Sequence, residues 1–275
     1  MKIHTCVVYK DMENSEVLKI FDRLIEEEYP QYQAGQLTES DLVYAKEDYC
    51  TAVNALLEMA GNYGFSGNLW HTYLTWLLVN SENAFSKACE IVGPVEGSVN
   101  VMAHHDLAII KELFDFAIEK IDEMVGLGMA DVLKNYVHTS DSSKMYNRRI
   151  RDRICTLSQE LTKTEDVDSF MAALVNFYGE FGVGKFGLNK AFRLRENGDG
   201  TATIEPITNI AHVYLEDLVG YEIPKQKLID NTEAFVEGRK ANNCLLFGDA
   251  GTGKSSSIKG IVNRYYEQGD RKSVV

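Results

Sequence analysis

Residues 248–255 read Gly248-Asp249-Ala250-Gly251-Thr252-Gly253-Lys254-Ser255 and match G-x-x-x-x-G-K-[ST], the pattern of a Walker A phosphate-binding loop. The apolar run before it, Asn243-Cys244-Leu245-Leu246-Phe247, predicts a short buried parallel strand. Residues 256–268 follow the loop and carry apolar side chains at helical spacing, which predicts a helix. The pattern therefore lies between a predicted strand and a predicted helix, which is the context that its mechanism needs.

Each residue type in this stretch has a physical reason to be there. Glycines let the backbone curl until several N–H groups point inward, and the N-terminus of the following helix adds a partial positive charge. We expect Lys254 to reach the β- and γ-phosphates of a nucleotide and the Ser255 hydroxyl to bind Mg²⁺. The predicted phosphate-binding residues are Gly248, Asp249, Ala250, Gly251, Thr252, Gly253, Lys254, Ser255 and Ser256.

Composition limits the remaining possibilities. The chain has 275 residues, enough for one or two domains, and a formal net charge of −13. This acidity argues against general binding to nucleic acid or to an anionic membrane. The five cysteines are scattered and form no C-x-x-C, so we predict neither disulfides nor a zinc site. Without an N-terminal apolar signal or an apolar run long enough to span a bilayer, we expect a cytoplasmic protein with no membrane partner.

Residues 1–182 predict a mainly helical domain, which we interpret as a bundle because no repeat period is evident. Trp70, Tyr73 and Trp76 are expected to lie in its core. Helical spacing predicts helices over residues 16–28, 67–79, 82–92, 102–125, 130–137 and 144–161. A further helix is predicted to begin at a Thr38–Asp41 capping box and to end near Gly61. The last helix of this region is predicted to follow residue 161 and to be capped by Thr164.

The pattern changes after this region. Residues 183–212 predict a linker with a β-hairpin, whose strands cover residues 186–195 and 201–207 and whose turn is Asn197-Gly198-Asp199-Gly200. Residues 213–275 then predict the first part of an α/β phosphate-loop module, with a helix near residues 223–236 ahead of the loop.

Beyond the loop itself, the segment Asp217-Leu218-Val219-Gly220-Tyr221-Glu222, the following helix and Ala241-Asn242-Asn243-Cys244-Leu245-Leu246-Phe247-Gly248 resemble the start of an AAA+ ATPase module. With the run Asn231-Thr232-Glu233-Ala234-Phe235, the chain is similar to a bacterial AAA+ group, domain-of-unknown-function family 815. The resemblance implies ATP and Mg²⁺ as ligands and places Val219 and Gly220 against the adenine. As partners we expect an unknown protein and, in the intact protein, further copies of the same chain, and we expect the helical N-terminal domain to recognise a partner or a substrate.

This chain departs from the AAA+ pattern after the loop. A Walker B strand, a sensor, an arginine finger and a helical lid do not fit into residues 256–275, where residues 271–275 resemble the start of the next strand. We therefore expect a part of a longer protein. The intact protein is expected to hydrolyse ATP, whereas this chain is expected to bind ATP without hydrolysing it, with no catalytic residue other than Lys254.

Two further clusters could be functional sites or ordinary solvent-exposed helix faces. His104-His105-Asp106 invites a metal site, but adjacent helical residues point in different directions, so a partly exposed helix face is favoured. Four arginines between residues 148 and 153 form the only basic cluster in the sequence, for which a solvated helix face is favoured over a phosphate or nucleic-acid contact. The alternatives to an AAA+ ATPase are another phosphate-loop NTPase or kinase, and a helical interaction module whose conformation is controlled by nucleotide.

Overall fold

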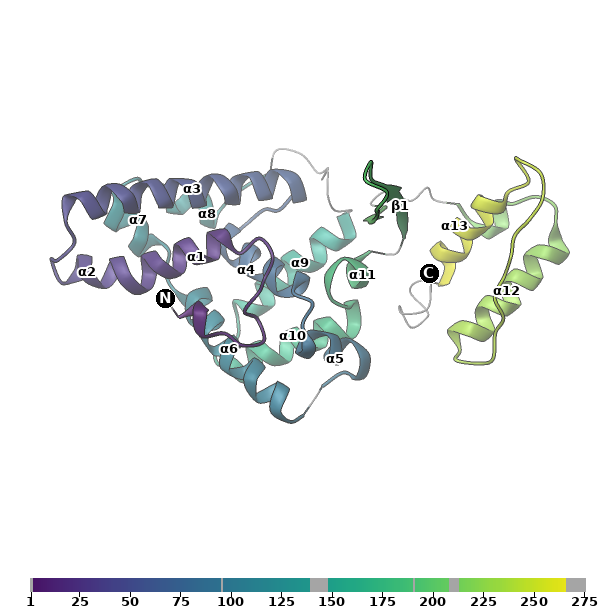
Figure 1. The fold of residues 1–275 in the computed structure, drawn as a ribbon, viewed down its shortest axis with the longest axis horizontal. Helices are drawn as coiled ribbons and strands as arrows, with labels where there is room; N and C mark the ends of the chain where they lie inside the picture. The colour runs from purple at the N-terminus through teal and green to yellow at the C-terminus, as the bar shows by residue number, and fades with distance from the viewer. Residues whose placement is uncertain (1, 95, 139–147, 190, 208–212, 266–275) are drawn as a thin grey trace. The chain divides into compact units, whose positions relative to one another are not determined.

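The computed structural model describes residues 2–94, 96–138, 148–189, 191–207 and 213–265 (Figure 1). The chain divides into two compact units, Met1–Gly184 and Lys185–Val275. The described residues are mainly helical and contain one two-stranded hairpin. In these residues no helix is both long enough and apolar enough to cross a membrane.

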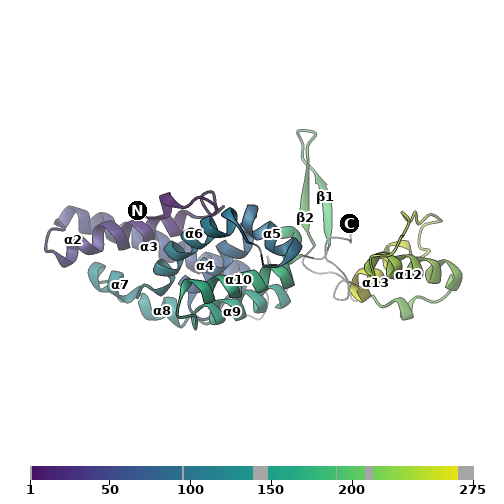
Figure 2. The same ribbon diagram turned by 90° about the horizontal axis from the view of Figure 1, so that it is seen from below.

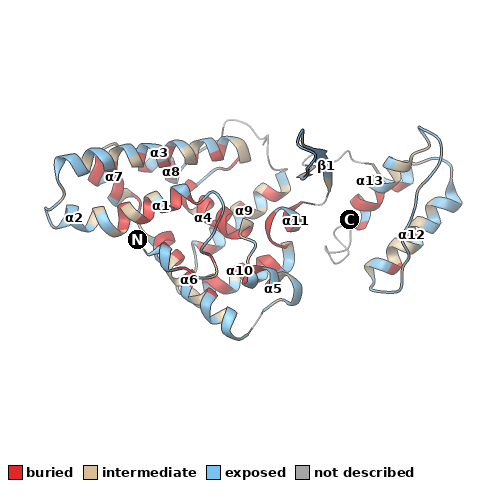
Figure 3. Ribbon diagram, in the orientation of Figure 1, coloured by how far each residue is buried: buried red, intermediate tan, exposed pale blue. Residues whose placement is uncertain are grey.

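The first unit is a bundle arranged around one buried helix, α4 (Leu69–Asn80). Its side chains are buried on every face, including Trp70, Tyr73 and Trp76, which confirms their predicted place in the core (Figure 3). A helix that is apolar all round has to be enclosed by its neighbours. Those neighbours are α3 (Glu39–Tyr63), α6 (Ser98–Asp115), α8 (Ala130–Lys134) and α9 (Arg148–Leu161).

The remaining elements pack around this centre. The short helix η1 (Ile3–Thr5) contacts α6, α1 (Glu16–Arg23) contacts α3, and α10 (Val167–Phe181) lies against α6, α9 and α5 (Ala84–Val92). The connection between α1 and α2 (Tyr29–Gln33) is the turn η2 (Leu24–Glu28), and α7 (Glu119–Val125) contacts both α2 and α3.

Side-chain caps fix where several of these helices begin. The predicted box is confirmed at α3, where the Thr38 side chain accepts a hydrogen bond from the Asp41 amide and Asp41 accepts one from the Thr38 amide. The prediction that Thr164 caps α10 is wrong. Asp166 is the cap, because its carboxylate accepts a hydrogen bond from the Ser169 amide at 2.8 Å, whereas the Thr164 hydroxyl donates to the Leu161 carbonyl.

One predicted helix boundary is wrong for a reason of backbone geometry, and another is close to its predicted place. The helix predicted over residues 16–28 does not end before Pro30, because a π-helical turn, in which the Tyr29 amide donates to the Leu24 carbonyl, carries the chain into α2. This wider turn accommodates a proline that lacks an N–H and would crowd a regular helical turn. The α3 helix ends at Tyr63, near Gly61 as predicted, and its cap is Gly64, whose φ of 73° is left-handed.

The helix predicted over residues 102–125 is divided into α6 and α7. The break lies at Phe116, whose extended backbone (φ −68°, ψ 128°) ends α6. After the break, Ile118, Ile121 and Met124 are all buried. Helical periodicity continued through the break, but one straight helix could not bury both apolar stripes against neighbours in different directions.

In the second unit, β1 (Phe192–Glu196) and β2 (Ala202–Pro206) form an antiparallel hairpin with Leu194 opposite Ile204 (Figure 2). The predicted turn is confirmed, because the Asn197 amide donates to the Thr201 carbonyl across it. The first strand does not begin at Phe186 as predicted. Residues Gly184–Leu188 form the short helix α11 instead.

The second unit also contains a pair of helices, α12 (Glu222–Val236) and α13 (Lys254–Tyr265), which pack against each other. The helix predicted near residues 223–236 is confirmed as α12. The short helix η3 (Leu215–Asp217) contacts α13 and leads towards α12. A small apolar cluster of Leu215, Ile229, Ile261 and Tyr265 holds the three elements together.

Candidate phosphate-binding site

The loop at residues 248–253 lies before α13, and the position of that helix is fixed by contacts along its second half. Ile261 and Tyr265 are buried in the apolar cluster, and the Tyr265 hydroxyl donates to the Glu233 carboxylate of α12 at 2.7 Å. Burial raises the pKa of Tyr265 to about 12, with a further contribution from the hydrogen bond to Glu233, so the hydroxyl keeps its proton at neutral pH. The start of α13 is therefore held by packing that does not involve the loop itself.

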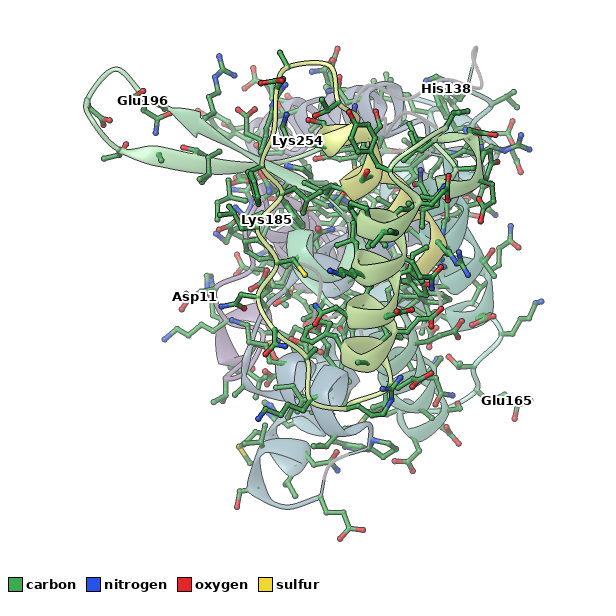
Figure 4. The ribbon with its side chains drawn as sticks, turned by 90° about the vertical axis from the view of Figure 1, so that its right-hand side faces the viewer. Asp11, His138, Glu165, Lys185, Glu196 and Lys254 are labelled. Atoms are coloured by element: carbon green, nitrogen blue, oxygen red, sulfur yellow. The ribbon has the colours of Figure 1, made fainter. Side chains whose placement is uncertain are left out.

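The loop curls around the side chain of Lys254. The Lys254 ammonium donates hydrogen bonds to the Gly248 carbonyl at 2.9 Å, to the Asp249 carbonyl at 2.5 Å and to the Thr252 hydroxyl at 3.2 Å. Figure 4 shows Lys254 where the loop meets the first turn of α13. The structure thus brings together four of the predicted residues, Gly248, Asp249, Thr252 and Lys254, around one positive charge.

Glycine is required at the bends of this curl. Gly248, Gly251 and Gly253 have φ angles of 142°, 81° and 80°, a region that other residues rarely adopt. The Thr252 hydroxyl donates to the Asp249 carbonyl at 2.8 Å and closes the turn between them. The sequence pattern and the backbone conformation therefore agree at Gly248 and Gly253, and Gly251 lies at a further bend that suits glycine.

The first turn of α13 supplies the remaining predicted groups. The first N–H groups of a helix have no acceptor within the helix, which leaves the amides of Lys254, Ser255 and Ser256 at the mouth of the loop. Ser255 is exposed, and Ser256 is partly exposed. One turn later, the Ser257 amide donates to the Gly253 carbonyl at 2.8 Å, which marks the start of regular helical bonding.

The strand predicted ahead of the loop is absent from the described residues. Residues 243–247 form no ladder, and Leu245 and Phe247 are 85% and 86% exposed. Cys244 is exposed too, so its predicted place on a buried strand is wrong. A strand needs a neighbour to pair its backbone groups, and within the described ranges only β1 and β2 are paired in a sheet.

The predicted adenine contacts, Val219 and Gly220, lie in the connection between η3 and α12. Val219 is 96% exposed, and Gly220 has a left-handed φ of 86°. Tyr221 follows with φ 56°, an uncommon conformation for a residue with a side chain. The Lys225 ammonium donates to the Leu218 carbonyl at 3.0 Å and steadies this connection from the first turn of α12.

One contact that the sequence patterns did not predict holds the segment that precedes the loop. The Asn231 side chain of α12 donates to the Asn242 carbonyl at 2.8 Å and accepts from the Asn242 amide at 2.9 Å. Its amide group also lies 3.2 Å from the Cys244 sulfur. No local spacing signal links Asn231 to Asn242, because the pairing depends on how the chain folds back after α12.

The side chains of the two other candidate clusters make separate contacts. His104 pairs with Asp168 at 3.1 Å and His105 with Asp106 at 2.9 Å, in separate contacts. Across the described residues no group of three or more His, Cys, Asp or Glu side chains could hold a metal ion. In the arginine cluster, Arg148 and Arg151 pair with Asp152, while the Arg153 guanidinium lies 4.0 Å from the centre of the Phe181 ring.

The hairpin, the helix pair and the loop all lie in the region that similarity to known proteins identifies. Residues 187–274 match the family described as "Protein of unknown function (DUF815)". This confirms the family resemblance for the C-terminal part of the chain. The DUF815 region contains every predicted phosphate-binding residue and both predicted adenine contacts, whereas the helical bundle lies outside it. No curated protein and no solved structure was found to be similar to the chain.

Proposed function

We propose that the DUF815 region of this chain binds ATP with Mg²⁺ through residues 248–256, as the nucleotide-binding part of an AAA+ ATPase. In this proposal the helical unit recognises a protein partner. The observation that carries the proposal is the closed loop around Lys254, with an ammonium group and a helix N-terminus at the same point.

The chemistry of this arrangement suits a polyphosphate. The ammonium of Lys254, the amides of the first turn of α13 and the partial positive charge of that helix end all favour negative charge. A bound phosphate would replace the Gly248 and Asp249 carbonyls as partners of the Lys254 ammonium. Because the positive φ angles of the three glycines already curl the loop, we expect its backbone to need little rearrangement to accept the phosphates.

The hydroxyl of Ser255 is the group that would bind Mg²⁺, which prefers oxygen ligands and would neutralise part of the phosphate charge. Val219 would lie against the adenine, with Gly220 permitting a close approach of the backbone. The Val219 side chain is exposed in this structure, and a bound adenine would cover it.

The assignment of partner recognition to the helical unit is supported by an open groove between α9 and α10. It is lined by apolar residues such as Leu157, Ala173 and Phe177 and by charged ones such as Arg153 and Glu160. Such a mixed surface suits a protein segment better than a nucleic-acid backbone, in keeping with the acidic chain.

Calorimetric titration of residues 1–275 with Mg·ATP tests the proposal. We expect binding by the wild-type chain, weaker binding when EDTA removes Mg²⁺, and loss of binding in Lys254→Ala. Lys259→Ala is the matched control, because it removes the same charge from an exposed position on α13. Equal affinity in both variants would overturn the phosphate role of Lys254, and a preference for Mg·GTP would point to another class of phosphate-loop protein.

A further inference from the structure

Asn231 forms with Asn242 the kind of reciprocal pair that neighbouring β-strands make. Its side-chain amide donates to the Asn242 carbonyl and accepts from the Asn242 amide, at 2.8 and 2.9 Å. One asparagine side chain thus satisfies both backbone groups of a residue six positions before the loop begins at Gly248. A side-chain amide has one acceptor oxygen and two N–H donors, which suits this double contact.

The same helix also holds the other side of the loop. Glu233, two residues after Asn231 on α12, accepts the hydrogen bond from Tyr265 near the end of α13. The segment before the loop and the helix after it are therefore both attached to α12 by polar contacts. The two contacts differ in how much other packing supports them. The α13 helix is also held by buried Ile261, whereas Leu245 and Phe247 in the segment before the loop are exposed.

We infer that Asn231 is a positioning residue for nucleotide binding, which anchors the chain before the phosphate loop and thereby holds the loop in its closed form. This inference rests on the proposed function. Because residues 243–247 form no ladder in the part of the chain that the structure describes, the pair with Asn231 takes the place of a strand partner at Asn242. Without this anchor the segment gains conformations that binding must then remove, which weakens affinity.

The experiment compares Asn231→Ala with Gln226→Ala in the full chain. Gln226 is the matched control because it is also a neutral amide on α12, and its side chain donates to Asp230 on the same helix at 2.7 Å. Two quantities are measured for each protein. They are the Kd for Mg·ATP and the rate of hydrogen exchange, at times of seconds, in the peptide that covers residues 242–247.

We expect Asn231→Ala to weaken Mg·ATP binding about tenfold, equivalent to about 1.4 kcal/mol, and to speed exchange in that peptide, while Gln226→Ala changes neither. Asn231→Asp provides a second variant of the same shape, which keeps an acceptor for the Asn242 amide but loses the donor to its carbonyl. It should weaken binding as well, with a smaller change in exchange at Asn242.

The possible results separate the two proposals. If the wild-type chain binds Mg·ATP and Asn231→Ala binds equally well, the role of Asn231 is overturned while the proposed function stands. Weaker binding with unchanged exchange also overturns it, because the effect would not act through residues 242–247. If the wild-type chain does not bind Mg·ATP, the proposed function and the inference fall together.

Discussion

Gly260 of α13 packs so closely against Leu215 of η3 that no larger residue fits between them. A Cβ atom on Gly260 would lie 2.8 Å from Leu215 Cδ2, 3.0 Å from its Cγ and 3.3 Å from its backbone nitrogen. The backbone of the loop-bearing helix therefore rests directly on the segment that leads towards Val219. This contact connects the two parts of the proposed nucleotide site through the apolar cluster.

Replacement of Gly260 by alanine should loosen α13. Overpacking of this kind costs about 1–3 kcal/mol, because either Leu215 or the helix has to move. Hydrogen exchange in the full chain should become faster in peptides covering Lys254–Tyr265.

Gly61→Ala is the control, because Gly61 lies within α3 and a Cβ there meets no atom within 4 Å. Alanine at this position should raise the stability of the first unit by up to about 1 kcal/mol, since it is the better helix former. Unchanged or slower exchange in α13 of Gly260→Ala would contradict the close packing against Leu215.

We expect the Asp106 carboxylate to stabilise the first unit by holding the N-terminal segment in place. It is fully buried on α6 and accepts hydrogen bonds from the amides of Val7, Val8 and Tyr9 at 2.6–3.0 Å. In Asp106→Asn an N–H₂ group competes for the place of an acceptor, so we expect a loss of roughly 2–3 kcal/mol. Urea unfolding followed by tryptophan fluorescence measures this loss, because both tryptophans lie on α4 of the first unit.

Asp168→Asn provides the control for this measurement. Its side chain is 87% exposed and contacts His104, so its replacement should leave the unfolding midpoint nearly unchanged. Equal midpoints for the two variants would mean that the amides of residues 7–9 find other partners at little cost.

His71 should make the stability of the first unit depend on pH. Burial lowers the pKa of His71 below its ordinary value of 6.5, and its ring stacks on Phe114 with 4.1 Å between centres. The unfolded chain therefore takes up a proton at His71 before the folded chain does. The contribution of neutral His71 is complete above about pH 6.5 and is lost as the pH falls from there towards the lower pKa of the folded state.

His71→Gln cannot titrate and serves as the comparison. The difference in urea midpoint between wild type and this variant should become smaller, or reverse, between pH 7.5 and pH 5.5. Titration of the many carboxylates affects both proteins alike and cancels in the difference. A difference that stays constant over this range would show that His71 titrates alike in both states.

Local spacing in the sequence determined several loops, turns and helix ends of this protein. The glycines of the run from Gly248 to Ser255 predicted a curled loop, because glycine adopts positive φ angles at little cost, whereas the hydrogen bonds from the Lys254 ammonium to the loop carbonyls were not predicted. Asn197–Gly200 predicted the hairpin turn, and Thr38 with Asp41 predicted the start of α3. These features depend on residues within a few positions of one another, so a pattern in the sequence is sufficient to predict them.

Tertiary structure decided the features that depend on distant partners. The apolar run before the loop predicted a buried strand, yet Leu245 and Phe247 are exposed. No strand among the described residues pairs with this segment. Asp106 looked like part of a histidine cluster, but it holds amides about a hundred positions earlier in the chain. Asn231 had no predicted contact until the chain folded back to Asn242. Sequence periodicity describes which residues share a face, whereas the neighbour that covers that face, or pairs with that backbone, is chosen only when the whole chain packs.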